Sequence, residues 1–348
     1  MLKRSEKTAL RFPHAEPPGP GELIEIADGI LWTRIPLPFR LDHVNVYLIE
    51  DHGGWAVLDT GVDNGASRQV WESLLAELLQ GRSLTKVIVT HFHPDHIGLA
   101  GWLCKRFDLP LYTSQTTYLS CINISLQPGA LEAAPYREFY LRHGLDPHVA
   151  DIVMTQGHGY LRLVHGLPLT FRRIVAGDTL TIGGRDFLLL SGDGHAPEQI
   201  MLLAKSDGLF LAADQVLAKI SPNVSVWAVD PFGDPLGLYL RSLRSLKGQV
   251  APDALVLPGH QLAFYGLHTR IDELIEHHEL RCNLILQACK KEAHSAAELV
   301  PVLFPKVLDP HQMSFAFSET QAHINYLLGK GEISSVLSSD RVERVVCA

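Results

Sequence analysis

The amino-acid sequence predicts a layered fold of strands and helices with a mainly helical C-terminal part. Between about residues 22 and 265, short apolar runs bounded by turn residues alternate with segments of helical periodicity. A mostly helical segment, 115–165, interrupts this alternation, and we interpret it as an insertion over the main domain. From residue 266 three helical segments precede a β-like tail. We therefore expect a main domain, 22–265, and a C-terminal domain, 266–348.

The first half of the main domain follows a Pro-rich lead-in, residues 1–21. Val70 to Leu79 places its apolar residues on one helical stripe, and a wholly apolar strand, 87–89, leads into a His-rich turn. A helix is expected to follow from about His96 to Phe107. The other expected strands of this half are 29–34, 44–49 and 56–58.

The second half begins with a predicted hairpin after the insertion. Gly183 and Gly184 separate the expected strands 179–182 and 186–190, and paired glycines are typical of a tight turn between antiparallel strands. Further expected elements are the strands 200–203 and 209–211, the helix 236–246 and the strand 254–257.

The C-terminal domain combines helices with a β-like end. Ser295 and Glu298 have the spacing of a capping box at the start of the second helix. The tail, 333–346, is β-like, and three helices followed by a hairpin are typical of a winged helix. The expected helices are 268–289, 295–303 and 318–328.

The composition limits the classes of protein to which the chain can belong. The chain has 348 residues, a net charge of −8 and 46% hydrophobic residues, which is typical of a globular protein with room for a large core. Binding to a nucleic-acid backbone requires a surplus of Lys and Arg. The C-terminal domain has 8 Lys and Arg against 11 Asp and Glu, and the predicted helix 318–328 has no Lys or Arg. The charge balance therefore argues against nucleic acid as the partner.

The sequence also bears on the compartment. No apolar run approaches the roughly 18 residues of a membrane span, and no apolar signal segment follows the charged N-terminus. The five cysteines form no C-x-x-C pair. We therefore expect a cytoplasmic protein with reduced thiols and no membrane partner.

The densest chemical signal is the run THFHPDH at residues 90–96, directly after an apolar strand. On an extended turn, His91 and His93 project to the same side and can bind one metal ion. Asp95 and His96 lie where the chain bends into a helix and can face a second ion. Imidazole and carboxylate are ligands of zinc, iron and manganese.

Four further candidates each follow an expected strand. Layered folds of strands and helices collect ligands at the carboxyl ends of their strands, so we expect these side chains to join the His-rich turn. They are Asp59, His195, Asp214 and His260.

The pattern His91-x-His93-x-Asp95-His96, followed by Gly-His195, Ala-Asp214 and Pro-Gly-His260, resembles the motifs of the metallo-β-lactamase superfamily over roughly residues 24–265. The resemblance implies an α+β fold, an αββα sandwich with metals at one edge of two sheets. It implies a first ion held by His91, His93 and His195 and a second held by Asp95, His96 and His260. Asp214 would bridge both ions, and Asp59 would orient the His-rich loop.

The ligand set resembles that of the dinuclear hydrolases, including glyoxalase II-like thioesterases, lactonases and ribonucleases, because Asp214 stands where the best-known β-lactamases have cysteine. Residues 194–199 and 221–225 resemble a bacterial branch of metallo-hydrolases. Its C-terminal winged helix resembles that of the human β-lactamase-like endoribonuclease and of fungal polyketide thioesterases.

The resemblance implies a metal-bound hydroxide that cleaves small acyl thioesters, esters or lactones, with Asp95 and Asp214 as catalytic residues. The implied cofactors are two divalent ions, zinc first, with iron or manganese as alternatives. An endoribonuclease, an iron-dependent persulfide dioxygenase and a non-catalytic binding protein stay open as alternatives.

The role of the C-terminal domain is also left open. We interpret it as a lid, a dimerisation surface or a substrate wall, so a homodimer is one of the options, and we expect a small acyl compound as the partner of the site. His277 and His278 lie beside acidic residues on the long predicted helix, and we expect both to be solvated.

Overall fold

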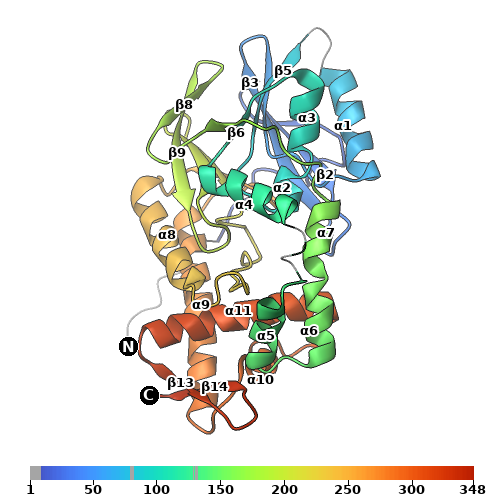
Figure 1. The fold of residues 1–348 in the computed structure, drawn as a ribbon. Coiled ribbons are helices and arrows are strands. Elements are labelled where there is room, and N and C mark those ends of the chain that lie inside the picture. Colours follow the sequence, from blue (N-terminus) through green and yellow to red (C-terminus); the bar gives the residue numbers. More distant parts are fainter. Residues whose placement is uncertain (1–8, 79–81, 128, 130–131) are drawn as a thin grey trace, which may run out of the picture.

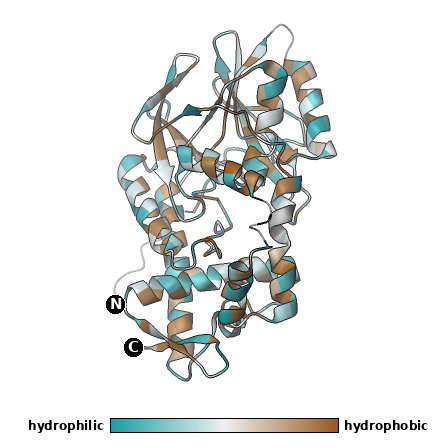
Figure 2. Ribbon diagram, viewed as in Figure 1, coloured by the Kyte–Doolittle hydropathy of each residue, from teal (hydrophilic) through white to brown (hydrophobic). Residues whose placement is uncertain are grey.

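Two β-sheets lie face to face, with helices on both outer faces (Figure 1). The computed structural model describes residues 9–78, 82–127, 129 and 132–348. The arrangement is the expected αββα sandwich, and Figure 2 shows its strands as largely hydrophobic and its helices as alternately hydrophobic and polar.

The first sheet has seven strands in the order β1-β2-β3-β4-β5-β6-β7. Strands β1 to β4 form an antiparallel meander, whereas β5, β6 and β7 continue parallel to β4. Their bounds are Ile24–Ala27, Ile30–Pro36, His43–Asp51, Gly54–Leu58, Ser83–Ile88, Leu111–Thr113 and Arg172–Arg173.

The second sheet has five strands in the order β12-β11-β10-β9-β8. Only β11 and β12 pair in parallel within this sheet, and β8 and β9 form the expected hairpin around Gly183 and Gly184. The bounds of β8 to β12 are Thr179–Ile182, Arg185–Gly192, Gln199–Ala204, Leu209–Ala213 and Leu255–Pro258.

Three apolar layers hold the sandwich together. Trp32 and Phe187 pack between the two sheets. The outer face of the first sheet is covered by α1 (Gly65–Leu78), α3 (Ala100–Phe107) and α4 (Gln115–Leu126). The outer face of the second sheet is covered by α8 (Pro235–Gln249) and α9 (Leu267–Cys289). Each sheet therefore buries both faces, as its apolar strands require.

The expected insertion is helical and connects two cores. Tyr118 and Cys121 of α4 belong to the core of the first sheet, whereas Phe139 of α5 and Val153 of α6 belong to the core formed with α9 and α11. The helices after α4 are α5 (Ala134–Arg142), α6 (Pro147–Met154) and α7 (Gln156–Arg162). The insertion thus packs against the C-terminal helices as well as the sandwich (Figure 1).

The C-terminal part contains three helices and a hairpin. The helices are α9, α10 (Ala296–Leu303) and α11 (Pro310–Gly329), and the hairpin strands are β13 (Ile333–Leu337) and β14 (Glu343–Cys347). The capping box of Ser295 and Glu298 is confirmed by reciprocal hydrogen bonds of 3.2 and 2.7 Å. The winged-helix assignment and the domain boundary at residue 265 stay predictions.

Two helix predictions were wrong in their bounds. A single helix from His96 to Phe107 is instead α2 (Pro94–Ile97) and α3, because the Leu99 N–H bonds to the Gly61 carbonyl and the Thr60 hydroxyl. Helix α11 starts at Pro310 rather than at residue 318. Asp309 and Gln312 form a capping box there, which satisfies the first backbone N–H groups.

No helix in the described part of the chain is long and apolar enough to cross a membrane.

Candidate metal centre

Five strand ends bring the predicted ligands to one edge of the sandwich. Strands β4 and β5 are parallel neighbours in the first sheet, and β9, β11 and β12 run in a common direction in the second. Their carboxyl ends therefore lie at the same edge. The residues that follow them include Asp59 after β4, the His-rich turn after β5, His195 after β9, Asp214 after β11 and His260 after β12.

His91, His93 and His195 form the first group of candidate nitrogen ligands. His93 Nδ1 lies 3.0 Å from His91 Nε2 and 3.0 Å from His195 Nε2. Bonds of 2.0–2.1 Å to a tetrahedral zinc place neighbouring ligand nitrogens about 3.3 Å apart. Both distances from His93 Nδ1 are therefore close to the edge length of such a tetrahedron.

Asp95, His96 and His260 form a second group beside the first. Asp95 Oδ2 lies 3.6 Å from His96 Nε2 and 3.3 Å from His260 Nε2. His96 and His260 are buried, whereas the Asp95 side chain keeps 18% of its surface exposed. This carboxylate is therefore the member of the second group that solvent reaches most readily.

Asp214 lies between the two groups. Its Oδ2 is 3.4 Å from His195 Nε2, 3.5 Å from His96 Nε2 and 3.2 Å from His260 Nε2. One carboxylate oxygen thus faces candidate ligand atoms of both groups.

Hydrogen bonds outside the centre determine which ring nitrogens face inward. His195 Nδ1 donates to the Asn223 carbonyl at 2.8 Å, and His260 Nδ1 donates to the His43 carbonyl at 2.7 Å. His96 Nδ1 donates to Asp59 Oδ2 at 2.8 Å. Since each Nδ1 bonds outward, the neutral tautomer of each ring, which is the form that binds a metal, presents a bare Nε2 to the centre.

The imidazole nitrogens and carboxylate oxygens that converge here point lone pairs at one another, which suits the binding of a cation. His96 Nε2 and Asp214 Oδ1 are buried atoms without a hydrogen-bond partner in the described part of the chain. Buried polar atoms left unpaired cost about 1–3 kcal/mol each. Bare imidazole nitrogens and a carboxylate that face one another in this way fit divalent metal ions of the zinc, iron or manganese type.

Asp59 lies where it was predicted to orient the His-rich loop. Its Oδ1 accepts the Thr90 N–H at 2.8 Å, and its Oδ2 accepts the Thr90 hydroxyl at 2.9 Å as well as the His96 ring. The Thr90 hydroxyl in turn accepts from His91 Nδ1 at 2.9 Å. One buried carboxylate therefore orients two candidate ligands.

The charges of the cluster shift the pKa values of its imidazoles in opposite directions. Burial and the neighbouring imidazoles hold the pKa of His91 well below its ordinary value, and burial together with His195 lowers the pKa of His93 to about 3. Burial also opposes protonation of His260, but Asp214 and Asp95 outweigh it and raise its pKa to about 10. The carboxylates thus attract positive charge to the second group.

The backbone around the centre is tight. Asp59, Ala213 and Gln261 have φ values of 62°, 46° and 69°, a region that non-glycine residues rarely adopt. A Cβ at Gly259 would lie 2.2 Å from Asp214 Oδ1, so only glycine fits beside this carboxylate. Strain of this kind concentrates at functional sites.

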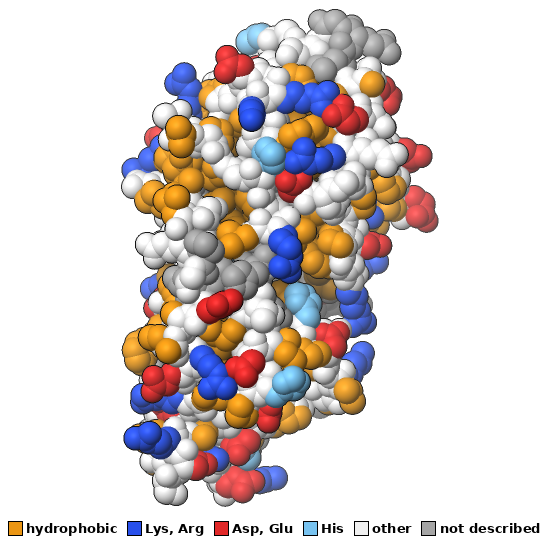
Figure 3. All heavy atoms as spheres, turned by 45° about the vertical axis from the view of Figure 1, so that its right-hand side comes forward, with side chains coloured by type: hydrophobic (Ala, Val, Ile, Leu, Met, Phe, Trp, Pro, Cys, Tyr) orange, Lys and Arg blue, Asp and Glu red, His pale blue; other side chains and the backbone are white. Residues whose placement is uncertain are grey.

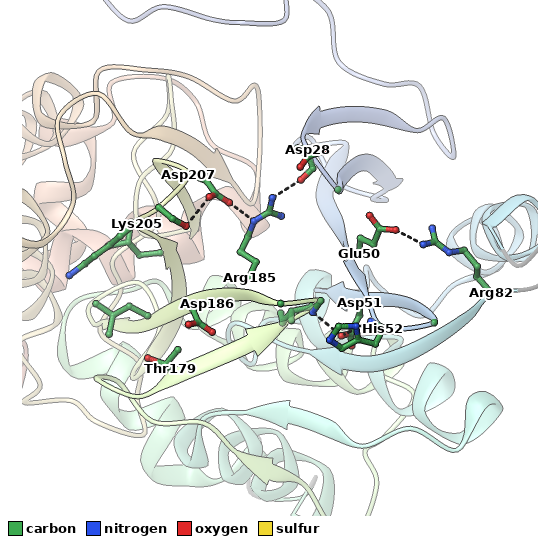
Figure 4. A pocket seen from close by; sticks show the side chains of 18 residues that line it. Asp28, Glu50, Asp51, His52, Arg82, Thr179, Arg185, Asp186, Lys205 and Asp207 are labelled. Atoms are coloured by element: carbon green, nitrogen blue, oxygen red, sulfur yellow. Dashed lines mark hydrogen bonds and ion pairs between the residues drawn. The ribbon is translucent and has the colours of Figure 1, made fainter.

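A separate cavity lies at the opposite end of the sandwich. It has a volume of about 970 Å³ and is lined by turns between strands (Figure 4). Arg185 bonds to Asp207 and to the Asp28 carbonyl, and Glu50 pairs with Arg82. Its charged groups thus largely neutralise one another, and it contains none of the predicted ligands.

Comparison with known protein families settles the membership of the chain. The family model described as "Metallo-beta-lactamase superfamily" matches residues 39–260. The chain belongs to the metallo-beta-lactamase superfamily. A second model, "Metallo-beta-lactamase-like, C-terminal domain", matches residues 282–347.

Two relatives of this superfamily member cover almost its whole length, and a third covers part of it. A solved "Beta-lactamase domain protein" of Burkholderia ambifaria is 38% identical, with a TM-score of 0.90 over 97% of this chain and 98% of that chain. "Probable metallo-hydrolase YqjP" of Bacillus subtilis is 25% identical over 90% of this chain and 97% of its own length. A "Hydroxyacylglutathione hydrolase" of Thiobacillus denitrificans is 28% identical over 37% of this chain and 48% of its own length.

Several residues around the metallo-beta-lactamase centre were not anticipated. Thr90 lies within the run THFHPDH, and its hydroxyl was a signal in the sequence for a hydrogen-bond partner of Asp59. Asn223 and His43 act through backbone carbonyls, which have no residue-type signal. Asn45 and Tyr47 donate to the Pro258 carbonyl at 2.9 and 2.8 Å and so hold the loop of His260.

The expectation that His277 and His278 are solvated was wrong for His278. This side chain is fully buried between α9 and α11, and the Nε2 of His277 is buried as well. The acidic neighbours on α9 indicated an exposed face, but α11 packs against the turn that carries both histidines.

Proposed function

We propose that this metal-dependent hydrolase holds two divalent ions at the centre and cleaves small acyl thioesters, with esters and lactones as related substrates. The observation that carries the proposal is the position of Asp214 Oδ2, within 3.2–3.5 Å of His96, His195 and His260. A carboxylate oxygen facing ligands of both groups suits a bridged pair of ions, with zinc as the first choice.

The chain's own residues have distinct roles in this proposal. His91, His93 and His195 hold the first ion, Asp95, His96 and His260 hold the second, and Asp214 bridges them. When bound, two such ions lower the pKa of water and polarise the oxygen of the bond that is attacked. Asp95, partly exposed at the mouth of the second group, is placed to take the proton of the attacking water.

Two observations favour thioesters over phosphodiesters as substrates: the charge of helix α11 and the similarity of the chain to hydrolases of acyl thiol esters. Helix α11 has no Lys or Arg and one acidic residue, Glu319, so it has no cationic surface for a nucleic-acid backbone. Hydroxyacylglutathione hydrolases, which by their name act on an acyl thiol ester, are among the similar proteins. The iron-dependent dioxygenase remains an alternative that oxygen consumption by an iron-loaded protein would favour.

The test is hydrolysis of a panel of acyl-CoA thioesters of different chain length by zinc-loaded protein. We expect turnover that a chelator abolishes and that added metal restores. Asp214→Asn removes the bridging charge and should reduce kcat/KM by at least about 100-fold, since changes even outside the ligand sphere cost 10–100-fold.

The matched control is Asp207→Asn, which changes a carboxylate at the opposite end of the sandwich and should keep full turnover. Chelator-sensitive cleavage of lactones without cleavage of thioesters would leave a hydrolase but overturn the thioester proposal. Cleavage of single-stranded RNA alone would favour the endoribonuclease.

A further inference from the structure

A second cluster of histidines lies between α9 and α11. His277 and His278 come from α9, and Glu319 and His323 come from α11. His278 and His323 have no exposed surface, and Glu319 is 7% exposed. None of these residues belongs to the catalytic centre, so their burial needs its own explanation.

The hydrogen bonds of this cluster determine the tautomers of two rings. His323 Nδ1 lies 2.8 Å from the Glu319 carbonyl, which can only accept, so Nδ1 carries the proton. His323 Nε2 is then bare and accepts from His278 Nδ1 at 3.1 Å. Burial lowers the pKa of His323 to about 3, and burial with its neighbours holds the pKa of His278 well below its ordinary value. Both rings are therefore neutral near pH 7.

The result is a lone pair on His278 Nε2 that has no donor. This atom is buried and has no hydrogen-bond partner in the described part of the chain, and the same holds for His277 Nε2. Burial, reinforced by Arg281, lowers the pKa of His277 to about 4, so this ring is also neutral. Two unpaired buried nitrogens cost about 1–3 kcal/mol each unless a water or an ion binds them.

A carboxylate completes the group. One oxygen of Glu319 and one nitrogen each of His277 and His278 lie within 4.8 Å of one another. Arg281 holds Glu319 Oε1 in an ion pair and so orients the carboxylate. Two imidazoles and a carboxylate are a usual ligand set of zinc-type cations.

We propose that His277, His278 and Glu319 form an additional site for a divalent cation of the zinc type, separate from the catalytic centre. Its affinity is modest, because the positive charge of Arg281 opposes the cation. The site ties α9 to α11 behind the catalytic loops. Tyr239 connects this site to the catalytic centre. The centroid of its ring lies 5.5 Å from that of His278, and its hydroxyl donates to the Gln215 carbonyl next to Asp214.

The first test is zinc content after equilibrium dialysis against Zn²⁺ at neutral pH. His277→Gln should bind one zinc equivalent fewer than the wild-type protein, with acyl hydrolysis unchanged. His148→Gln, at an exposed position on α6, is the control and should bind as much zinc as the wild type. The difference in zinc content between the variants does not depend on how many ions the catalytic centre binds. The test of the additional site is therefore independent of the proposed function.

A second measurement does not rely on a variant folding correctly. Crystals of the wild-type protein soaked in Zn²⁺ should give an anomalous difference peak about 2.0–2.2 Å from the Nε2 atoms of His277 and His278. Equal zinc content in wild type and His277→Gln, or electron density for a water without an anomalous signal, would overturn the proposal.

Discussion

Asp59 shows how one buried carboxylate determines the geometry of the centre. It accepts from the Thr90 backbone, the Thr90 hydroxyl and the His96 ring, and Thr90 passes the same constraint to His91. The orientation of two candidate ligands therefore depends on an atom group that touches no metal.

The change Asp59→Asn tests this role. An amide nitrogen cannot accept from the Thr90 hydroxyl or the His96 ring, so both imidazoles lose their fixed orientation. We expect a loss of about 10–100-fold in metal affinity, measured by competition with a chromophoric chelator. Asp63→Asn, which affects an ion pair with Arg68 instead, is the control, and unchanged affinity in Asp59→Asn would contradict the assigned role.

The residues that could be predicted and those that could not differ in a physical way. The predicted ligands follow apolar strands, and the direction of those strands brings them together. These ligands are His91, His93, Asp95, His96 and the three later ones. The Asn223 and His43 carbonyls and the neighbours of His278 depend on how distant segments pack. No local pattern of side chains carries that information.

At the scale of elements, α11 connects the C-terminal part to the catalytic loops. The Val226 N–H donates to the Ser318 carbonyl at 3.1 Å, and Asn325 Nδ2 donates to the Pro231 and Gly233 carbonyls. The segment after Asp214, which contains Asn223, thus rests on this helix. Its start was predicted eight residues too late, although Asp309, Pro310 and Gln312 supply a start signal.

The N-cap of α11 contributes a measurable part of the free energy of unfolding. Asp309→Ala removes the acceptor of the Gln312 N–H and should lower the free energy of unfolding by about 1 kcal/mol, as measured by urea denaturation. Glu77→Ala at an exposed position of α1 is the control and should change it by less than about 0.5 kcal/mol. Equal stability of Asp309→Ala and the wild type would mean that α11 does not depend on this cap.

A second element-scale feature joins the two sheets at the end away from the centre. Asp51 of β3 accepts from Lys86 and Thr85. It also accepts from the Gly183 N–H of the β8–β9 turn, beside the cavity of Figure 4. Burial alone would raise the pKa of Asp51, but these hydrogen bonds hold it well below its ordinary value. The ionised carboxylate therefore stabilises the folded state above about pH 4, and this contribution is lost as the pH falls further.

The change Asp51→Asn should reveal that pH dependence. It leaves the largely buried Lys86 unpaired and should cost about 3 kcal/mol of unfolding free energy at pH 7. The difference between wild type and variant should shrink below pH 4, because Asp51 of the unfolded wild-type chain is then protonated while the folded carboxylate stays ionised to lower pH. Urea denaturation of metal-free protein at pH 7 and pH 3.5 measures both values, and a pH-independent difference would show that the charge of Asp51 is not the cause.

At the scale of the whole molecule, the charges do not form a surface for nucleic acid. On the face shown in Figure 3, Lys and Arg side chains of the described residues are interspersed with Asp and Glu. With a net charge of −8 and no cation on α11, binding to a polyanion lacks its main driving force.

We accordingly expect no binding of single-stranded RNA at physiological salt. Fluorescence anisotropy of a labelled RNA should stay unchanged at micromolar concentrations of protein, with a basic RNA-binding protein as the positive control. Binding that weakens steeply with added salt would instead reveal a cationic surface and favour the endoribonuclease.

The bridging position of Asp214 is the central claim, and manganese electron paramagnetic resonance tests it most directly. The experiment uses His277→Gln protein loaded with Mn²⁺, so that the additional site between α9 and α11 does not contribute. A bridged pair predicts two bound ions and the multiline signal of exchange-coupled manganese, which Asp214→Asn should abolish. Fully active protein with one ion, or with two uncoupled ions, would contradict the account.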